Sequence, residues 1–129
     1  MLDTNAASAA LRGHPGVDAK LEALVPGQWC VSAVTCSELR YGVALRPSAA
    51  RLHQLVDAFL ELTPVLAWDQ EAATRHGRLR ARLRSSGTPL GDFDEMIAGH
   101  ALAVGAVLVT SDRAFDRVPD LRIENWTTL

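Results

Sequence analysis

The sequence predicts an α/β domain of three layers, in which helices flank a mostly parallel central sheet of four to five short strands. Short apolar runs alternate with longer segments of helical periodicity along the whole chain. The run "AVLVT" at residues 106–110 is too apolar to alternate, which is typical of a strand covered on both faces. The length of 129 residues suits a single domain spanning residues 1–129.

The first half of the chain contains two predicted strands and four predicted helices. "MLDT" resembles the end of a short strand, and "QWCVSA" a short buried one. Glycine and proline separate the first two helices, and Pro47 ends the third, after which Ser48 can cap the fourth. The helices are expected at about residues 4–11, 16–25, 35–46 and from 48 onwards, the last with Leu52, Leu55, Val56, Phe59 and Leu60 at helical spacing.

The second half repeats the alternation. "TPVLAW" is a predicted strand, and Asp69 can cap a long helix to about residue 86 that turns Leu79 and Leu83 inward. A further helix is expected at residues 91–105, with Gly105 as its stop, before the strand at 106–110. Asp112 then begins a short helix, and "LRIENW" is the last strand. The inward residues of the helix at 91–105 are expected to be Phe93, Met96, Ile97, Ala101 and Val104.

Composition limits the classes of function. No apolar run is long enough for a membrane span and no signal peptide is visible, so the expected location is the cytoplasm. Cys30 and Cys36 fit no metal-ligand spacing and are expected to be reduced. The net charge of −2 excludes an overall basic nucleic-acid-binding surface, although five of the twelve arginines cluster in "RHGRLRARLR". Aromatic residues make up 5% of the chain, too few to predict a stacking platform for single-stranded RNA.

Four acids are expected at one end of the sheet. Sites in such folds form beyond the carboxyl ends of the strands, where Asp3, Glu38, Asp94 and Asp112 are all placed by the predicted elements. Two carboxylates ~4 Å apart repel by about 4 kcal/mol at an effective dielectric of ~20. A hard cation with oxygen ligands, Mg²⁺ or Mn²⁺, would offset that repulsion.

Each acid also has a purely structural interpretation. Asp3 and Asp112 can be helix N-caps, and Glu38 can close a capping box with Thr35 in "TCSE". In "GDFDE", Asp92 and Asp94 point in different directions. Asp92 is expected to be the N-cap, with Glu95 at the third helical position completing the cap, and Asp94 to be the member of the site.

The segments "LDTN", "VSAVTCSELRYG", "GDFDEMIAGHALAVGAVLVTSD", "RAFDRV" and "IENW" resemble a PIN-domain ribonuclease, and more narrowly the VapC toxins of type II VapBC toxin–antitoxin pairs. The resemblance covers nearly the whole chain. It implies metal-site acids at Asp3, Glu38, Asp94 and Asp112, with Asp116 as an alternative to the last. The polar residues that the family places beside the ligands match Thr4 or Asn5, and Thr110 or Ser111.

The same resemblance implies hydrolysis of RNA, often a tRNA and in the most similar members initiator tRNA, with Mg²⁺ or Mn²⁺. Asp3 and Asp94 would hold the cation, and Glu38 and Asp112 would reach it directly or through water. A separate VapB-type antitoxin chain and a homodimer are also implied. Arg75, Arg78 and Arg82 share one helical stripe and are the expected phosphate contacts, with a solvated helix face as the alternative.

Two other classes of function compete with the nuclease. A phosphotransfer domain would use Asp3 as a nucleophile, but the only lysine is Lys20, in an early helix, and Asn5 stands where a phosphatase needs a second aspartate. A metal-free interaction module would use the acids only as caps. Titration with a metal separates this module from the nuclease.

Overall fold

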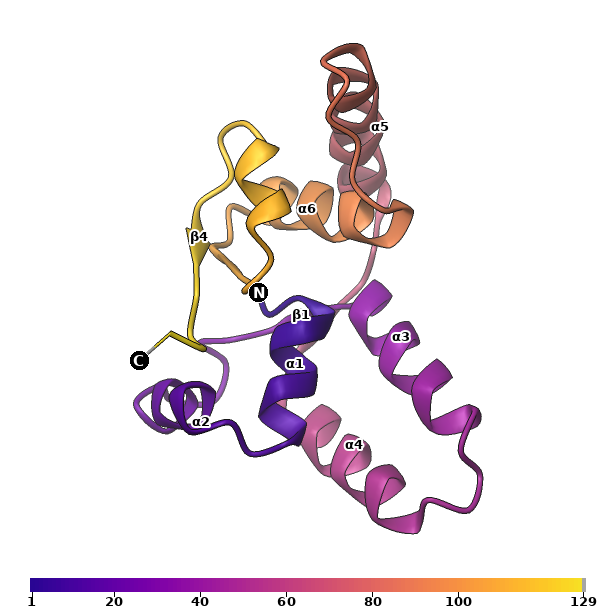
Figure 1. Ribbon diagram of the computed structural model, residues 1–129, viewed down its shortest axis with the longest axis vertical. Coiled ribbons are helices and arrows are strands. Elements are labelled where there is room, and N and C mark those ends of the chain that lie inside the picture. Colours follow the sequence, from indigo (N-terminus) through magenta and orange to yellow (C-terminus); the bar gives the residue numbers. More distant parts are fainter. Residues whose placement is uncertain (129) are drawn as a thin grey trace.

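A parallel sheet of very short strands forms the centre of the structure, a computed structural model that describes residues 1–128 (Figure 1). Parallel pairs join β1 to β2 and β3 to β4, and Leu2 bridges both Val31 and Val109, again in parallel. The order across the sheet is therefore β2, β1, Leu2, β3, β4, which confirms the predicted parallel sheet of four to five strands. The strands are β1 (Val31–Ser32), β2 (Val65–Leu66), β3 (Leu108–Val109) and β4 (Ile123–Glu124).

Helices connect these strands, as the sequence predicts. Within residues 1–128, no helix is long and apolar enough to cross a bilayer. Helix α5 projects from the body of the molecule, and α6, which packs against it, lies across its base (Figure 1). The helices are α1 (Thr4–Leu11), α2 (Pro15–Glu22), α3 (Ala33–Ala44), α4 (Ala50–Leu62), α5 (Gln70–Ser85) and α6 (Asp92–Val104), with the 3-10 helix η1 (Arg113–Arg117).

Apolar clusters cover both faces of the sheet. Leu108 packs with Ile97 and Phe115, whereas its neighbour Val109 packs with Leu2 and Val31 on the other side. Successive strand residues point to opposite faces, so these two clusters are the two interfaces of a three-layer domain.

Two predicted helix starts are wrong. Helix α3 begins at Ala33, because the Ser32 hydroxyl accepts a hydrogen bond from the Val34 amide. Helix α4 begins only at Ala50, with no side-chain cap. A turn after Pro47, in which the Ala50 amide donates to the Ser48 carbonyl, leaves Ser48 too early to cap. The predicted cap of α5 is confirmed, since Asp69 accepts from the Ala72 amide at 3.0 Å.

Helix α6 differs most from its sequence prediction. Ile97 and Ala101 are fully buried as expected, but Phe93 is 57% exposed and Val104 49% exposed. The middle of the helix is buried around almost its whole circumference, so burial depends on position along the axis more than on one apolar face. Phe93 and Val104 lie near the two ends, beyond that cover. The C-terminal stop is confirmed: Gly105 is left-handed, with φ 67°.

The start of α6 also corrects the predicted cap. The N-cap is Gly91, which has no side chain to accept a capping hydrogen bond. Asp92 is the first helical residue, and its side chain is 73% exposed. Glu95, expected to complete that cap, is fully buried instead. With Gly91 in the capping position, Asp92 belongs to the helix itself and the predicted cap at Asp92 is wrong.

Candidate active site

The sheet brings the first and last of the four acids together. Asp3 follows the central strand position, and its amide donates to the Val109 carbonyl at 3.0 Å. Asp112 comes three residues after that carbonyl, beyond the end of β3. The adjacent register of Leu2 and Val109 therefore places both acids at the same end of the sheet.

Asp3 is both a helix cap and a member of the acid cluster. It is 2% exposed, and its Oδ1 accepts from the Ala6 amide at 2.7 Å, so the capping interpretation is correct. Burial raises the pKa of Asp3, hydrogen bonds from Thr110 and Ala6 oppose that rise, and the charges of Asp112 and Glu38 add to it. The cap and the cluster therefore use the same carboxylate.

Asp94 faces the other three acids from the first turn of α6. Its half-buried carboxyl has its pKa raised to about 6, first by burial and then by the negative charges of Asp3, Glu38 and Asp112. Asp3, Glu38 and Asp112 therefore each lie within electrostatic range of Asp94. The structure thus brings together the set that the sequence placed at the strand ends, and it selects Asp94 over Asp92.

Glu38 is held by α1 and not by its own helix. The Thr4 hydroxyl donates to Glu38 Oε1 at 2.5 Å, across 34 residues of sequence. The capping-box alternative with Thr35 is wrong, because α3 starts two residues earlier and Glu38 lies in its second turn. Thr4 therefore fixes the orientation of this carboxylate toward the end of the sheet.

Of the four polar residues expected beside the acids, two contact them. Thr4 bonds to Glu38, and the Thr110 hydroxyl bonds to Asp3 while accepting from the Asp112 amide at 3.0 Å. Asn5 and Ser111 are exposed. Asp112 also caps η1, accepting from the Ala114 amide at 2.9 Å, so its capping interpretation is correct as well.

Within residues 1–128, no basic side chain forms a salt bridge with the cluster. Among residues 1–128, the salt bridges involve Asp57, Asp92 and Glu95 but none of the four clustered acids. As the side chains stand in this part of the chain, no three His, Cys, Asp or Glu residues converge closely enough to ligate one ion. The donor set is all carboxylate and uncompensated, which fits a hard divalent cation reached partly through water.

A groove of about 430 Å³ opens beside the cluster, between α1, α3 and α4. Thr4 and Glu38 lie at its polar end, and Arg12 and Arg46 also line it. Its walls are mostly apolar, formed by Leu11, Leu39, Val43, Leu45, Leu52 and Val56. Sequence reasoning missed this groove because no local pattern reports how three separate helices pack.

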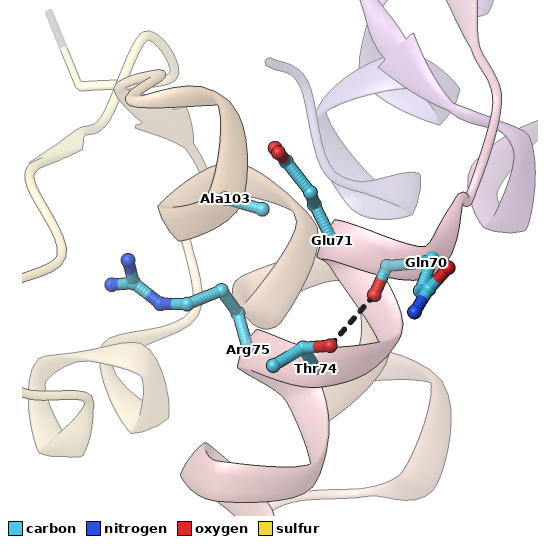
Figure 2. A pocket seen from close by; sticks show the side chains of 5 residues that line it. All are labelled: Gln70, Glu71, Thr74, Arg75 and Ala103. Carbon is cyan, nitrogen blue, oxygen red and sulfur yellow. Dashed lines mark hydrogen bonds between the residues drawn. The ribbon is translucent and has the colours of Figure 1, made fainter.

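The arginine stripe lies on one face of α5, as its spacing predicts. Arg75, Arg78 and Arg82 line one hollow of about 130 Å³, which Asp120 also borders. In Figure 2, Arg75 extends past Ala103, where a second hollow is bordered by Gln70, Glu71 and Thr74. Ala103 lies nine residues after Asp94, or about 14 Å along the α6 axis, so this end of the stripe is remote from the acids.

Arg80 and Arg84, which the stripe excludes, lie toward the start of α6. Both come within 3.9 Å of Asp92 Oδ1, and Arg84 is 3.9 Å from Glu95 Oε1. Arg80 and Arg84 are thus nearer than Arg75 to the first turn of α6, which carries Asp94. The antiparallel packing of α5 on α6 decides this, and no sequence spacing could have revealed it.

Comparison with known proteins agrees with the fold. The PIN domain family matches residues 1–121. The tRNA(fMet)-specific endonuclease VapC of Salmonella typhimurium is 39% identical over 127 residues, covering 98% of this chain and 96% of that protein. The crystal structure of DNA-bound VapBC from Salmonella typhimurium superposes with a TM-score of 0.92 at 38% identity, covering 98% of this chain and 96% of that one.

A second solved structure has nearly as high a TM-score. VapBC2 from Rickettsia felis, bound to a DNA fragment from its promoter, has a TM-score of 0.90 at 33% identity, with 98% of this chain and 97% of that chain covered. The predicted resemblance is therefore confirmed along nearly the whole chain. The chain belongs to the PIN domain family and, within it, to the VapC ribonucleases of the VapBC toxin–antitoxin systems.

Proposed function

We propose that the chain is a Mg²⁺-dependent endoribonuclease that hydrolyses RNA phosphodiester bonds at the acid cluster. The observation that carries the proposal is a set of four carboxylates at one end of the sheet, with mutual repulsion and no basic partner. Asp3 and Asp94 would hold the cation, with Glu38 and Asp112 reaching it directly or through water. Mn²⁺ has the same ligand preferences and is expected to substitute.

The residues of the chain have distinct roles in this mechanism. A bound cation would lower the pKa of a coordinated water and offset charge on the phosphate. Thr110 and the Ala6 amide keep Asp3 in place, and Thr4 keeps Glu38 in place, so the ligands are oriented before substrate arrives. Glu38 or Asp94 would orient the attacking water or accept its proton.

The phosphotransfer alternative is weaker on this geometry. A nucleophilic aspartate needs an accessible carboxylate, whereas Asp3 is 2% exposed and one of its oxygens is bound to the Ala6 amide.

The substrate is a tRNA, with initiator tRNA as the first candidate, because the Salmonella relative is named a tRNA(fMet)-specific endonuclease. The partner is a VapB-type antitoxin, and its apolar segment would occupy the groove between α1, α3 and α4, whose polar end carries Thr4 and Glu38. An occupant of that groove would reach the acid cluster. A homodimer of the chain is part of the same proposal.

The test is cleavage of initiator tRNA with increasing Mg²⁺ by the parent chain, Asp94→Asn and Asp92→Asn. Asp94→Asn keeps the side-chain size and removes a ligand charge, so we expect it to lose activity while remaining folded. Asp92→Asn is the matched control on the same helical turn and should cleave as the parent does. Full activity of the parent in EDTA would overturn the metal requirement.

A second test concerns the phosphate contacts. Replacing Arg78 and Arg82 by alanine should weaken tRNA binding and reduce its salt dependence, because fewer counterions are released. Replacing Arg80 and Arg84 is the matched comparison, since those side chains lie toward Asp92. If only the replacement of Arg80 and Arg84 changes the salt dependence of binding, the RNA runs along the start of α6. The stripe of Arg75, Arg78 and Arg82 is then only a solvated helix face.

A further inference from the structure

We propose that a crevice between α3 and α6, lined by Phe93 and Trp68, binds an unstacked nucleobase of the RNA next to the scissile phosphate. This inference rests on the proposed nuclease function and adds a substrate subsite to it. It follows from an exposed aromatic side chain next in the chain to Asp94, a fixed second aromatic wall and the crevice that both line.

The exposed Phe93 side chain does not belong to the apolar core. It is 57% exposed, whereas Phe115 is 1% exposed in the main core. Its neighbour in the sequence is Asp94, which faces the acid cluster. Phe93 also lines one crevice with Trp68, Met96 and Val34, so its exposed ring is part of a contiguous apolar surface of the kind that a ligand covers.

The crevice has a second aromatic wall that is already fixed. The Trp68 indole Nε1 donates to the Met96 carbonyl at 3.1 Å, and its ring meets His76 edge-on with centroids 5.5 Å apart. Both contacts hold the half-buried indole in one orientation, so little side-chain freedom would be lost on binding. The cavity between the walls measures about 260 Å³ and is otherwise lined by Ala33, Val34, Ser37 and Met96.

Its position relative to the acids identifies the ligand. Ser37 on one wall immediately precedes Glu38, and Phe93 on the other immediately precedes Asp94. The crevice and the acids therefore share one turn of α3 and one turn of α6, on adjoining sides of these helices, and a substrate group that enters the crevice would be a nucleotide close to the phosphate at the acids. Its planar base matches an apolar, aromatic-walled slot.

The lining also indicates which RNA can enter. Ser37 is the one lining residue with a side-chain hydroxyl, and Trp68 Nε1 is already bound, so the walls offer few groups that read base edges. Binding should tolerate several bases but require one that is free to leave its helical stack.

The experiment combines a protein change with a matched RNA change. After the cleavage site in initiator tRNA is mapped, synthetic RNAs carrying that site are made with an abasic nucleotide on either side of the scissile phosphate. With the parent, one of the two should lower kcat/KM roughly 10- to 100-fold, the usual effect of losing one stacked base. Phe93→Ala should cause a similar loss on unmodified RNA and no further loss on that abasic RNA.

Val104→Ala is the control, since it removes an equally exposed apolar side chain at the other end of α6. The inference is overturned if the Phe93 and abasic effects multiply, or if Phe93→Ala behaves as Val104→Ala does. It is also overturned if Phe93→Ala changes only the oligomeric state in sedimentation, because the crevice is then covered by a second copy.

A binding measurement separates this inference from the nuclease proposal. The Kd of the same RNAs is measured with Asp94→Asn and with Asp94→Asn combined with Phe93→Ala, neither of which needs to cleave. Weaker binding of unmodified RNA by the double variant, with equal binding of the abasic RNA, supports the base site even if the parent cleaves without Mg²⁺. Equal Kd values for unmodified RNA overturn it even if cleavage is confirmed.

Discussion

Asp94→Asn should stabilise the chain in metal-free buffer at neutral pH. The pKa of Asp94 is raised from its ordinary value of 3.8 to about 6 by burial and by three neighbouring carboxylates. A raised pKa means that the folded state holds this proton more tightly than the unfolded state does. The stability that the protonated carboxyl contributes is therefore present below about pH 4 and is lost as pH rises through about 6.

The size of the effect follows from that shift. A rise from 3.8 to about 6 corresponds to at most about 3 kcal/mol at 1.36 kcal/mol per pH unit. Because the side chain is only half-buried, solvent screening reduces this to about 1–2 kcal/mol. We expect the melting temperature of Asp94→Asn to exceed that of the parent by roughly 4–8 °C at pH 7, and the two to converge near pH 4.

The assay is thermal melting of the parent and Asp94→Asn between pH 4 and pH 8, with EDTA and with Mg²⁺. Saturating Mg²⁺ at 100 times its Kd would stabilise the parent by about 2.7 kcal/mol and reverse the order of the two proteins. Asp92→Asn, whose side chain is 73% exposed, should melt as the parent does in every buffer. If the parent is more stable than Asp94→Asn in EDTA at pH 7, the proposed repulsion among the four acids is refuted.

Three further changes on α6 have expected outcomes. Gly99→Ala should lose about 1–3 kcal/mol in urea unfolding, because its Cβ would lie 2.7 Å from the His76 Cα and force α5 and α6 apart; an unchanged midpoint would contradict this packing. Glu95→Gln should raise the unfolding free energy by about 1 kcal/mol at pH 7. Both Glu95 oxygens are buried without a hydrogen bond, and Arg84 approaches only to 3.9 Å. A lower unfolding free energy would show that the ion pair of Arg84 and Glu95 is net stabilising. Asp92→Ala should change stability by less than about 0.5 kcal/mol, whereas loss of a true cap costs about 1 kcal/mol, and chemical denaturation distinguishes the two.

The order of the elements and the acids at the strand ends could be predicted from the sequence. Alternating apolar runs and helical periods predict a parallel sheet, and the ends of parallel strands meet at one edge. Asp3 and Asp112 follow from that rule alone. Asp94 was preferred over Asp92 because the two point in different directions on one helix, and the structure agrees, although the cap expected at Asp92 is formed by Gly91.

Contacts between distant segments could not be predicted, because local patterns carry no information about them. The bond from Thr4 to Glu38 spans 34 residues, and the bond from Thr110 to Asp3 depends on the strand register. Periodicity along α6 predicted a buried Phe93, and the spacing of "DFDE" predicted a capping role for Glu95, yet the structure exposes the first and buries the second.

The physical reason is that periodicity describes one helix in isolation, whereas burial depends on what covers each part of it. The sequence by itself determined the strand-end carboxylates, their charge and the family of the chain, since these depend on residue identity and order. Only the tertiary structure decided that Thr4 and Thr110 hold two of the acids and that the helix carrying Asp94 leaves Phe93 uncovered, because the packing of α1, α5 and the sheet around α3 and α6 sets those contacts.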